Sequence, residues 1–341
     1  MNAAEKTTSR LQYPDALAPA GAKRIGCVSY LNAKPLIEPI LARRDVEVAF
    51  AVPAELLPLL NAGTVAAGLL PIVDYQTSPA ELVLVPAGVI SSDGPTLTVR
   101  IFSRVPPEQI TRLHADTDSH TSVILAQLIL RRRYRQWPQI VPLKGYRGLA
   151  RPGRQPKNPP IAQINTDVDP DPSGRAGLNS GHNQQKNKGL ASGQHKQQLT
   201  VTGTGADAPV ALLLIGDKVV NAAPDQAVYH WQLDLGEQWK QLTRLPFVFA
   251  MWMMRAAAPD VELGRLLAEA RRQGQQMVEP LVARYAPACR WPTDLARRYF
   301  TEYLQYEVTP QCRSAVEIFF RLADEEGLLP LRRPVQYLEL A

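Results

Sequence analysis

The sequence predicts an α/β fold in which short buried strands alternate with helices and pair in largely parallel sheets. Apolar runs such as RIGCVSY (24–30) and TVAAGLLP (64–71) have the length of buried strands. Segments with helical spacing of apolar residues lie between them, as in NAKPLIEPILARR (32–44). With 341 residues, 45% of them hydrophobic and 21% charged, the chain can bury a core as one two-lobed domain or two domains.

The elements follow one another regularly through the first part of the chain. Residues 1–22 predict a disordered extension, and order is expected from Lys23. Asn32 occupies the position of a helix N-cap, with Pro35 in the first turn, where proline is tolerated. The further predicted elements are strands at 46–52, 82–92 and 97–103, a helix at 54–63 that Gly63 ends, and a helix over 123–134.

Residues 151–208 interrupt this alternation. The segment is rich in Gly, Pro, Gln and Asn and contains no aromatic residue, so it offers little apolar surface to bury. We expect a disordered insertion on the surface that activity does not require. The alternation resumes in PVALLLIGDKVV (209–220) with a buried strand that ends at Gly216-Asp217, and a further strand is predicted at 245–254. Helices are predicted near 259–286, 291–306 and 309–327.

The net charge of +6 does not indicate a nucleic-acid-binding protein. Part of the excess lies in the insertion, and the densest basic run, Arg131-Arg132-Arg133-Tyr134-Arg135, ends a predicted helix, where cations are stabilising. No apolar run is long enough to span a membrane, and the start lacks the pattern of a secretory signal. Three cysteines without CxxC spacing suit a reducing compartment, so a cytoplasmic location is expected.

The residues that could carry chemistry are small hydroxyl and amide side chains in three predicted strand-to-helix turns. These turns are Ser29-Tyr30-Leu31-Asn32, Ser91-Ser92-Asp93-Gly94 and Ser119-His120-Thr121-Ser122. The usual hydrolase, metalloprotease and phosphate-loop motifs are missing from the sequence. Because helix N-termini bind carboxylates well, the turns indicate a binder of a small anionic ligand. The alternative is that each polar side chain only caps its own helix.

Several sequence blocks together resemble the menaquinone-biosynthesis dehydratases of the futalosine route. They include RIGCVSYLNAKPL, GVISSDGPTLTVRIFSRVP, DTDSHTSV and LLIGDKVV, and the resemblance covers roughly 23–149 and 209–330. That family is similar in fold to the type II periplasmic solute-binding proteins, which implies two α/β lobes joined by two crossovers. We place lobe one at 23–97 plus 253–330, lobe two at 98–252, and a C-terminal tail at 331–341.

The resemblance also implies an activity and a site. The family's chorismate dehydratases convert chorismate to 3-[(1-carboxyvinyl)oxy]benzoate and water, and no metal or organic cofactor is expected. Asn32 is the expected catalytic residue; it would orient the substrate and hydrogen-bond developing charge, while a substrate oxygen takes the proton. The helix start at Ser119 would hold one substrate carboxylate. The expected substrate-binding residues are Ser29, Tyr30, Ser91, Ser92, Ser119, Thr121, Ser122 and Asp217.

Two alternatives remain open at this point. One is the sibling enzyme of the same pathway, which cleaves a cyclic futalosine to dihydroxynaphthoate and whose family uses a histidine base. The other is a non-catalytic protein that binds a small anion. Neither a nucleic-acid nor a membrane partner is expected, and the sequence does not indicate the oligomeric state.

Overall fold

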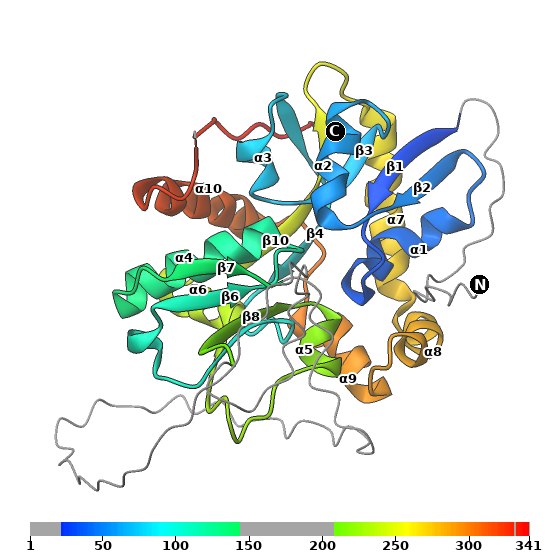
Figure 1. The fold of residues 1–341 in the computed structure, drawn as a ribbon. Helices are drawn as coiled ribbons and strands as arrows, with labels where there is room; N and C mark the ends of the chain where they lie inside the picture. The colour runs from blue at the N-terminus through cyan, green and yellow to red at the C-terminus, as the bar shows by residue number, and fades with distance from the viewer. Residues whose placement is uncertain (1–21, 144–207, 331, 341) are drawn as a thin grey trace, which may run out of the picture.

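The computed structural model describes residues 22–143, 208–330 and 332–340. The chain forms two α/β lobes, each built on one five-stranded sheet (Figure 1). The predicted extension 1–22 and insertion 151–208 lie outside the described residues, except for residues 22 and 208. Within the described ranges, no helix combines the length and the apolar character needed to cross a bilayer.

The sheet of lobe one has the order β2-β1-β3-β10-β4. Strand β1 pairs in parallel with β2 and β3, and β10 runs antiparallel between β3 and β4. The interior strand β10 (FVFAMWMMR) is apolar along almost its whole length, as expected for a strand with both faces covered. The bounds are β1 Lys23–Cys27, β2 Val46–Phe50, β3 Ala67–Pro71, β4 Leu82–Ser92 and β10 Phe247–Arg255.

The sheet of lobe two has the order β7-β6-β8-β5-β9. Strand β6 is parallel to β7 and β8, whereas β5 is antiparallel to β8 and β9. Both sheets are therefore mixed rather than purely parallel. The bounds are β5 Val99–Ser103, β6 Arg112–Ala115, β7 Gln139–Pro142, β8 Ala211–Ile215 and β9 Trp231–Asp234.

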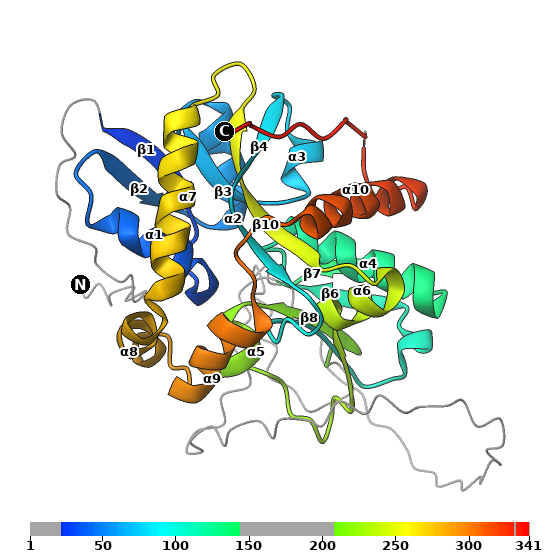
Figure 2. The ribbon, with the colours of Figure 1, turned by 180° about the vertical axis from the view of Figure 1, so that it is seen from behind.

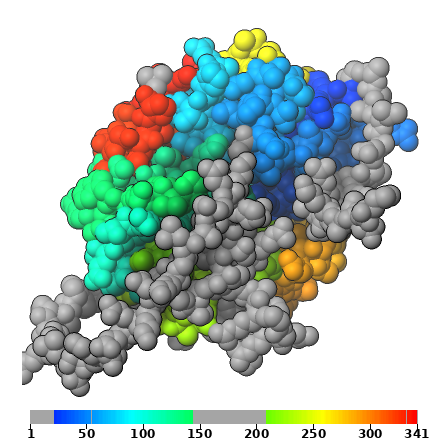
Figure 3. Space-filling view, viewed as in Figure 1, coloured from blue at the N-terminus to red at the C-terminus, as the bar shows by residue number. Residues whose placement is uncertain are grey.

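Helices cover the sheets and connect the lobes. Helices α1 and α7 pack against each other, and α7 packs on β4 (Figure 2). Helix α10 lies against both β10 and α4. Figure 3 shows α10, in red, beside α4, in green. The bounds are α1 Lys34–Leu41, α2 Pro53–Asn61, α3 Asp74–Thr77, α4 His120–Tyr134, α5 Asp217–Asn221, α6 Leu235–Thr243, α7 Val261–Gln276, α8 Val278–Ala288, α9 Thr293–Arg298 and α10 Pro310–Glu325, with 3-10 turns at Leu31–Ala33 and Pro107–Gln109 and a π turn at Tyr299–Tyr303.

The first crossover between the lobes is a strained turn held by a buried carboxylate. Leu97 has φ +67°, and the Thr98 N–H bonds the Thr96 carbonyl at 2.8 Å across it. Asp234 accepts from the backbone N–H groups of Thr96 and Leu97 at 2.9 and 2.8 Å and also caps α6. A Cβ on Gly236 would lie 2.5 Å from the Gly94 carbonyl oxygen, so only glycine lets α6 approach this turn.

The second crossover precedes β10. We predicted the return to lobe one at 252/253, but this boundary falls inside β10, which pairs along its length with β3 and β4. By strand pairing, lobe two ends before Phe247. The apolar run 245–254 correctly predicted the strand, but an apolar run does not reveal which sheet it joins.

The described part of the predicted tail packs on lobe one. Leu84 in β4 donates its N–H to the Gln336 carbonyl at 2.9 Å and accepts from the Leu338 N–H at 2.8 Å. The Tyr75 hydroxyl donates to the Pro334 carbonyl at 2.8 Å. This segment therefore covers the edge of β4 at Leu84, which limits pairing with other chains there.

The two lobes contact each other directly beside the start of α4. The Tyr30 hydroxyl donates to Asp118 Oδ2 at 3.3 Å, and the Val73 N–H donates to Thr121 Oγ1 at 3.2 Å. His120 Nδ1 lies 2.8 Å from Asp74 Oδ1. The lobes are thus closed on each other along this seam.

Candidate functional site

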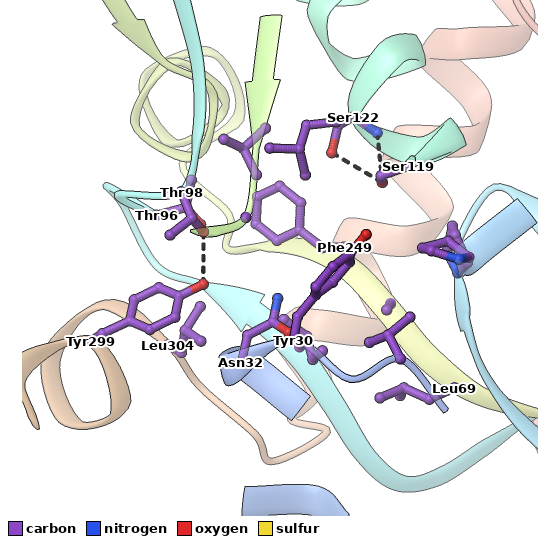
Figure 4. A pocket seen from close by; sticks show the side chains of 18 residues that line it. Tyr30, Asn32, Leu69, Thr96, Thr98, Ser119, Ser122, Phe249, Tyr299 and Leu304 are labelled. Carbon is purple, nitrogen blue, oxygen red and sulfur yellow. Dashed lines mark hydrogen bonds between the residues drawn. The ribbon is translucent and has the colours of Figure 1, made fainter. Parts of the chain in front are cut away.

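A pocket lies between the lobes and takes its walls from both. Its empty space, including the open mouth, measures about 610 Å³. Figure 4 shows Asn32, Thr98 and Tyr299 across the pocket from Ser119 and Ser122. The lining residues are Val28, Tyr30, Asn32, Pro53, Leu69, Pro71, Ile90, Thr96, Thr98, Val99, Ser119, Ser122, Ile215, Gly216, Phe249, Ala250, Tyr299 and Leu304.

Asn32 lies in the 3-10 turn that leads from β1 into α1. The prediction that Asn32 is the N-cap is wrong, because Ala33 is the N-cap of α1 and no side chain caps either helix start. Asn32 Oδ1 is buried and has no hydrogen-bond partner among the described residues. A buried polar atom without a partner costs free energy, so a ligand donor in the pocket would satisfy it.

Tyr299 and Thr98 form a hydrogen-bonded pair beside Asn32. The Tyr299 hydroxyl lies 2.7 Å from Thr98 Oγ1, and both residues are almost fully buried. Burial raises the pKa of Tyr299, while hydrogen bonds from Thr98 and from the Asn32 amide act in the opposite direction. The net shift is upward, so the phenol keeps its proton at neutral pH.

The sequence analysis did not select either residue of this pair. Thr98 belongs to the resemblance block, but no pattern gave it a role, and Tyr299 lies in a predicted helix with no motif around it. Their proximity depends on the way α9 and the π turn pack against the first crossover. The only signal for Tyr299 in the sequence was a tyrosine in the second half of the predicted helix 291–306.

The start of α4 forms the opposite wall. Ser119 is the N-cap, its Oγ accepts from the Ser122 N–H at 3.4 Å, and the Ser122 hydroxyl donates to it at 3.1 Å. Because Ser119 and Ser122 line the pocket, the positive end of the dipole of this 15-residue helix lies at the pocket wall. As predicted, the basic run forms the last turn of the same helix.

No lining residue among those described carries a formal charge. A charged cluster lies at the interlobe seam, where Lys218 bonds Asp116 and Asp118 at 2.6 Å each and Asp118 accepts from the Tyr30 hydroxyl. A ligand carboxylate in this pocket would therefore be bound by N–H and O–H groups rather than by a side-chain cation.

Four hydroxyl residues that we predicted in the site do not line the pocket. Ser29 is exposed, and Thr121 is fully buried with its Oγ1 bonded to the Val73 N–H. Ser91 and Ser92 lie at the end of β4, in a crossover between two strands rather than before a helix. Their hydroxyls are buried and donate to the carbonyls of Gln305 and Gly94. Of the predicted residues, the pocket brings together Tyr30, Asn32, Ser119 and Ser122.

Asp217 is also outside the pocket lining, next to Gly216. Its Oδ1 accepts from Trp291 Nε1 at 3.1 Å. Burial raises the pKa of Asp217 to about 6, against smaller lowering effects of the Trp291 bond and the Lys34 charge. In the folded protein this carboxyl therefore holds its proton more tightly than an exposed aspartate with a pKa of 3.8.

This shift predicts a pH-dependent loss of stability. Because the pKa of Asp217 is higher in the folded than in the unfolded protein, protonation of this carboxyl stabilises the fold. This contribution is complete below about pH 4 and is lost as the pH rises through about 6. We expect Asp217→Asn, which keeps an acceptor for Trp291, to be more stable than the wild type at pH 8 by up to about 3 kcal/mol. Thermal denaturation of both proteins from pH 4 to pH 8 tests this. Parallel profiles for the two proteins would contradict the prediction.

Comparison with solved structures identifies the fold. The chain is similar to protein AF1704 from Archaeoglobus fulgidus, with a TM-score of 0.58 and 11% identity over 91% of this chain and all of that one. It is also similar to the alkanesulfonate-binding protein SsuA from Xanthomonas axonopodis pv. citri (TM-score 0.52, 11% identity, 91% and 95% coverage). The CA3427 gene product of Candida albicans, described as having the generic periplasmic binding protein fold, matches with a TM-score of 0.52 and 9% identity over 92% of each chain. The predicted two-lobed fold of this kind is confirmed.

Sequence comparison identifies the family. A chorismate dehydratase from Thermus thermophilus is 26% identical over 257 residues, which are 73% of this chain and 76% of the relative. The model of a family described as menaquinone biosynthesis matches residues 23–150 and 194–325. These ranges include every residue that lines the interlobe pocket. The chain belongs to this menaquinone biosynthesis family.

Proposed function

We propose that the protein is a chorismate dehydratase, a hydro-lyase that converts chorismate to 3-[(1-carboxyvinyl)oxy]benzoate and water. The proposal depends chiefly on the similarity, over both lobes, to a relative of that name. The pocket supports it, because its hydroxyl and amide groups and the start of α4 can hydrogen-bond a carboxylate. A cytoplasmic location remains a prediction from the cysteine usage.

In the proposed reaction, the ring carbon that carries the enol ether loses its proton and the neighbouring carbon loses its hydroxyl. The proton and the hydroxyl leave as water, and the ring becomes aromatic. Because aromatisation is strongly favourable, the protein has mainly to position the substrate and stabilise developing charge. We assign this task to Asn32 and the binding of one carboxylate to the start of α4, while a substrate oxygen takes the proton.

Purified protein incubated with chorismate tests the proposal. We expect an aromatic product lighter than chorismate by one water, detected by mass spectrometry and ultraviolet absorbance. A parallel incubation with the cyclic futalosine tests the sibling activity. Turnover of the futalosine alone would replace the proposal with that activity, and binding of chorismate without turnover would indicate a non-catalytic binding protein.

The placement of the carboxylate gives a further prediction. Hydrogen bonds to a charged group contribute about 1.5–3 kcal/mol, so Ser122→Ala is expected to weaken chorismate binding by roughly 10- to 100-fold. Ser91→Ala is the control, since this hydroxyl donates to the Gln305 carbonyl outside the pocket lining. Titration calorimetry with the product, which keeps both carboxylates of chorismate and is not turned over, measures both affinities. An unchanged affinity in Ser122→Ala would show that the start of α4 does not bind the carboxylate.

A further inference from the structure

Tyr299 occupies a point where four segments of the chain meet. Its ring packs on Trp291 at 4.8 Å between centroids, and Trp291 Nε1 bonds Asp217 Oδ1 in α5 of lobe two. Its hydroxyl bonds Thr98 in the first crossover. Asn32, from the turn after β1, lines the same pocket wall beside Tyr299 (Figure 4). The phenol is therefore fixed from several sides.

Thr98 is itself held in place. Its N–H bonds the Thr96 carbonyl, and its carbonyl accepts from the Gly216 N–H at 2.8 Å. These bonds fix the backbone of Thr98 between the first crossover and lobe two. Since Tyr299 and Thr98 are 1% and 2% exposed, water does not compete for the bond between them.

Tyr299 also begins a π turn. The turn spans Tyr299–Tyr303 directly after α9, and the Leu304 N–H closes it on the Tyr299 carbonyl at 3.1 Å. Single π turns are rare in proteins and occur frequently at functional sites. Here the turn places both Tyr299 and Leu304 in the pocket wall.

Asn32 has few other constraints on its amide. It caps no helix, and its Oδ1 has no partner among the described residues. Since an amide presents an acceptor at one end and a donor at the other, its rotation decides what the pocket offers to a ligand. The Tyr299 hydroxyl lies on the same pocket wall beside this amide, so a hydrogen bond from Nδ2 to it would fix that rotation and leave Oδ1 available.

We infer that Tyr299 is a positioning residue for Asn32: its hydroxyl, held by Thr98, fixes the Asn32 amide so that Oδ1 can accept a hydrogen bond from the ligand. This inference rests on the proposed function, because chorismate carries a ring hydroxyl that can donate to Oδ1. The second hydrogen of Nδ2 then remains for developing charge. Tyr299 takes no proton itself, and it acts only through Asn32.

The variant Tyr299→Phe removes the hydroxyl and keeps the ring that packs on Trp291. We expect kcat for chorismate to fall about 10- to 100-fold while KM changes less than about threefold. Tyr229→Phe is the matched control, because it removes a buried hydroxyl that donates to the Pro209 carbonyl at 2.8 Å in the core of lobe two. This control is expected to keep the wild-type kcat.

A double-mutant cycle separates positioning from other effects. If Tyr299 acts through Asn32, then adding Tyr299→Phe to Asn32→Ala lowers kcat by less than about threefold. Crystal structures provide a readout independent of turnover. We expect one orientation of the Asn32 amide in the wild type and in Tyr229→Phe, and a rotated or mixed orientation in Tyr299→Phe.

Each outcome decides a different claim. An undiminished kcat in Tyr299→Phe, or an equal loss with and without Asn32, would overturn the positioning role. If the wild type does not turn over chorismate, the proposed function fails, and the crystal structures alone then decide the inference. An Asn32 amide with the wild-type orientation in Tyr299→Phe would overturn it.

Discussion

The Asn32→Ala variant is expected to lose turnover of chorismate by on the order of 100-fold or more while it keeps its fold. Removing a preorganised hydrogen-bonding group from a catalytic site costs far more in rate than in stability. Asn32 caps no helix and its Oδ1 has no partner among the described residues, so the folded protein loses few contacts. Steady-state kinetics together with thermal denaturation measures both effects.

A second asparagine provides the control for this experiment. Asn61 Oδ1 accepts from the Ser78 hydroxyl at 3.0 Å, outside the pocket lining. Asn61→Ala is expected to keep full turnover and to lose some stability, the opposite of Asn32→Ala. Wild-type turnover in a folded Asn32→Ala protein would leave Asn32 without a catalytic role.

Gly274→Ala is expected to destabilise the protein by about 3 kcal/mol or more. In an exposed helix, a change from glycine to alanine would stabilise the helix by about 1 kcal/mol, because alanine is the better helix former. Here a Cβ would lie 1.8 Å from the Pro35 carbonyl oxygen, so α7 and α1 would have to separate. Urea unfolding measures the loss.

Gly264, in the same helix, is the matched control. A Cβ there would lie 2.5 Å from Leu340 Cδ2, the end of a flexible side chain that can move aside. Gly264→Ala should therefore cost much less than Gly274→Ala. Equal stability of Gly274→Ala and the wild type would show that α1 and α7 tolerate a wider separation than the close contact implies.

The fold could be predicted largely because its long elements have clear periodicity. The helix ending in Arg131-Arg132-Arg133 and the buried strands of lobe one all followed from local patterns. Three short strands, Arg112–Ala115, Gln139–Pro142 and Trp231–Asp234, were not predicted as separate elements. Four residues are too few for alternation to be distinguished from a loop.

The site could be predicted only where its residues lie in a local motif. Asn32 and Ser119 belong to hydroxyl- and amide-rich turns, and both line the pocket. Ser91 and Thr121 look similar in sequence, yet their hydroxyls bond the protein backbone. Tyr299 belongs to the second chain segment of lobe one and is far from Asn32 in the sequence. No local sequence pattern predicts a contact between residues so far apart in the chain.

The position of β10 in its sheet has a consequence for the order in which the protein can fold during synthesis. All strands of lobe two precede residue 235, so its sheet can close before β10 emerges from the ribosome. Strand β4, however, pairs with β10 on one side and with the segment around Gln336 on the other, both made much later. Until then its eleven largely apolar residues have no strand partner, and Pro86 within it weakens pairing with other chains. A nascent chain that stops before Tyr299 could thus contain a folded second lobe and still lack the pocket.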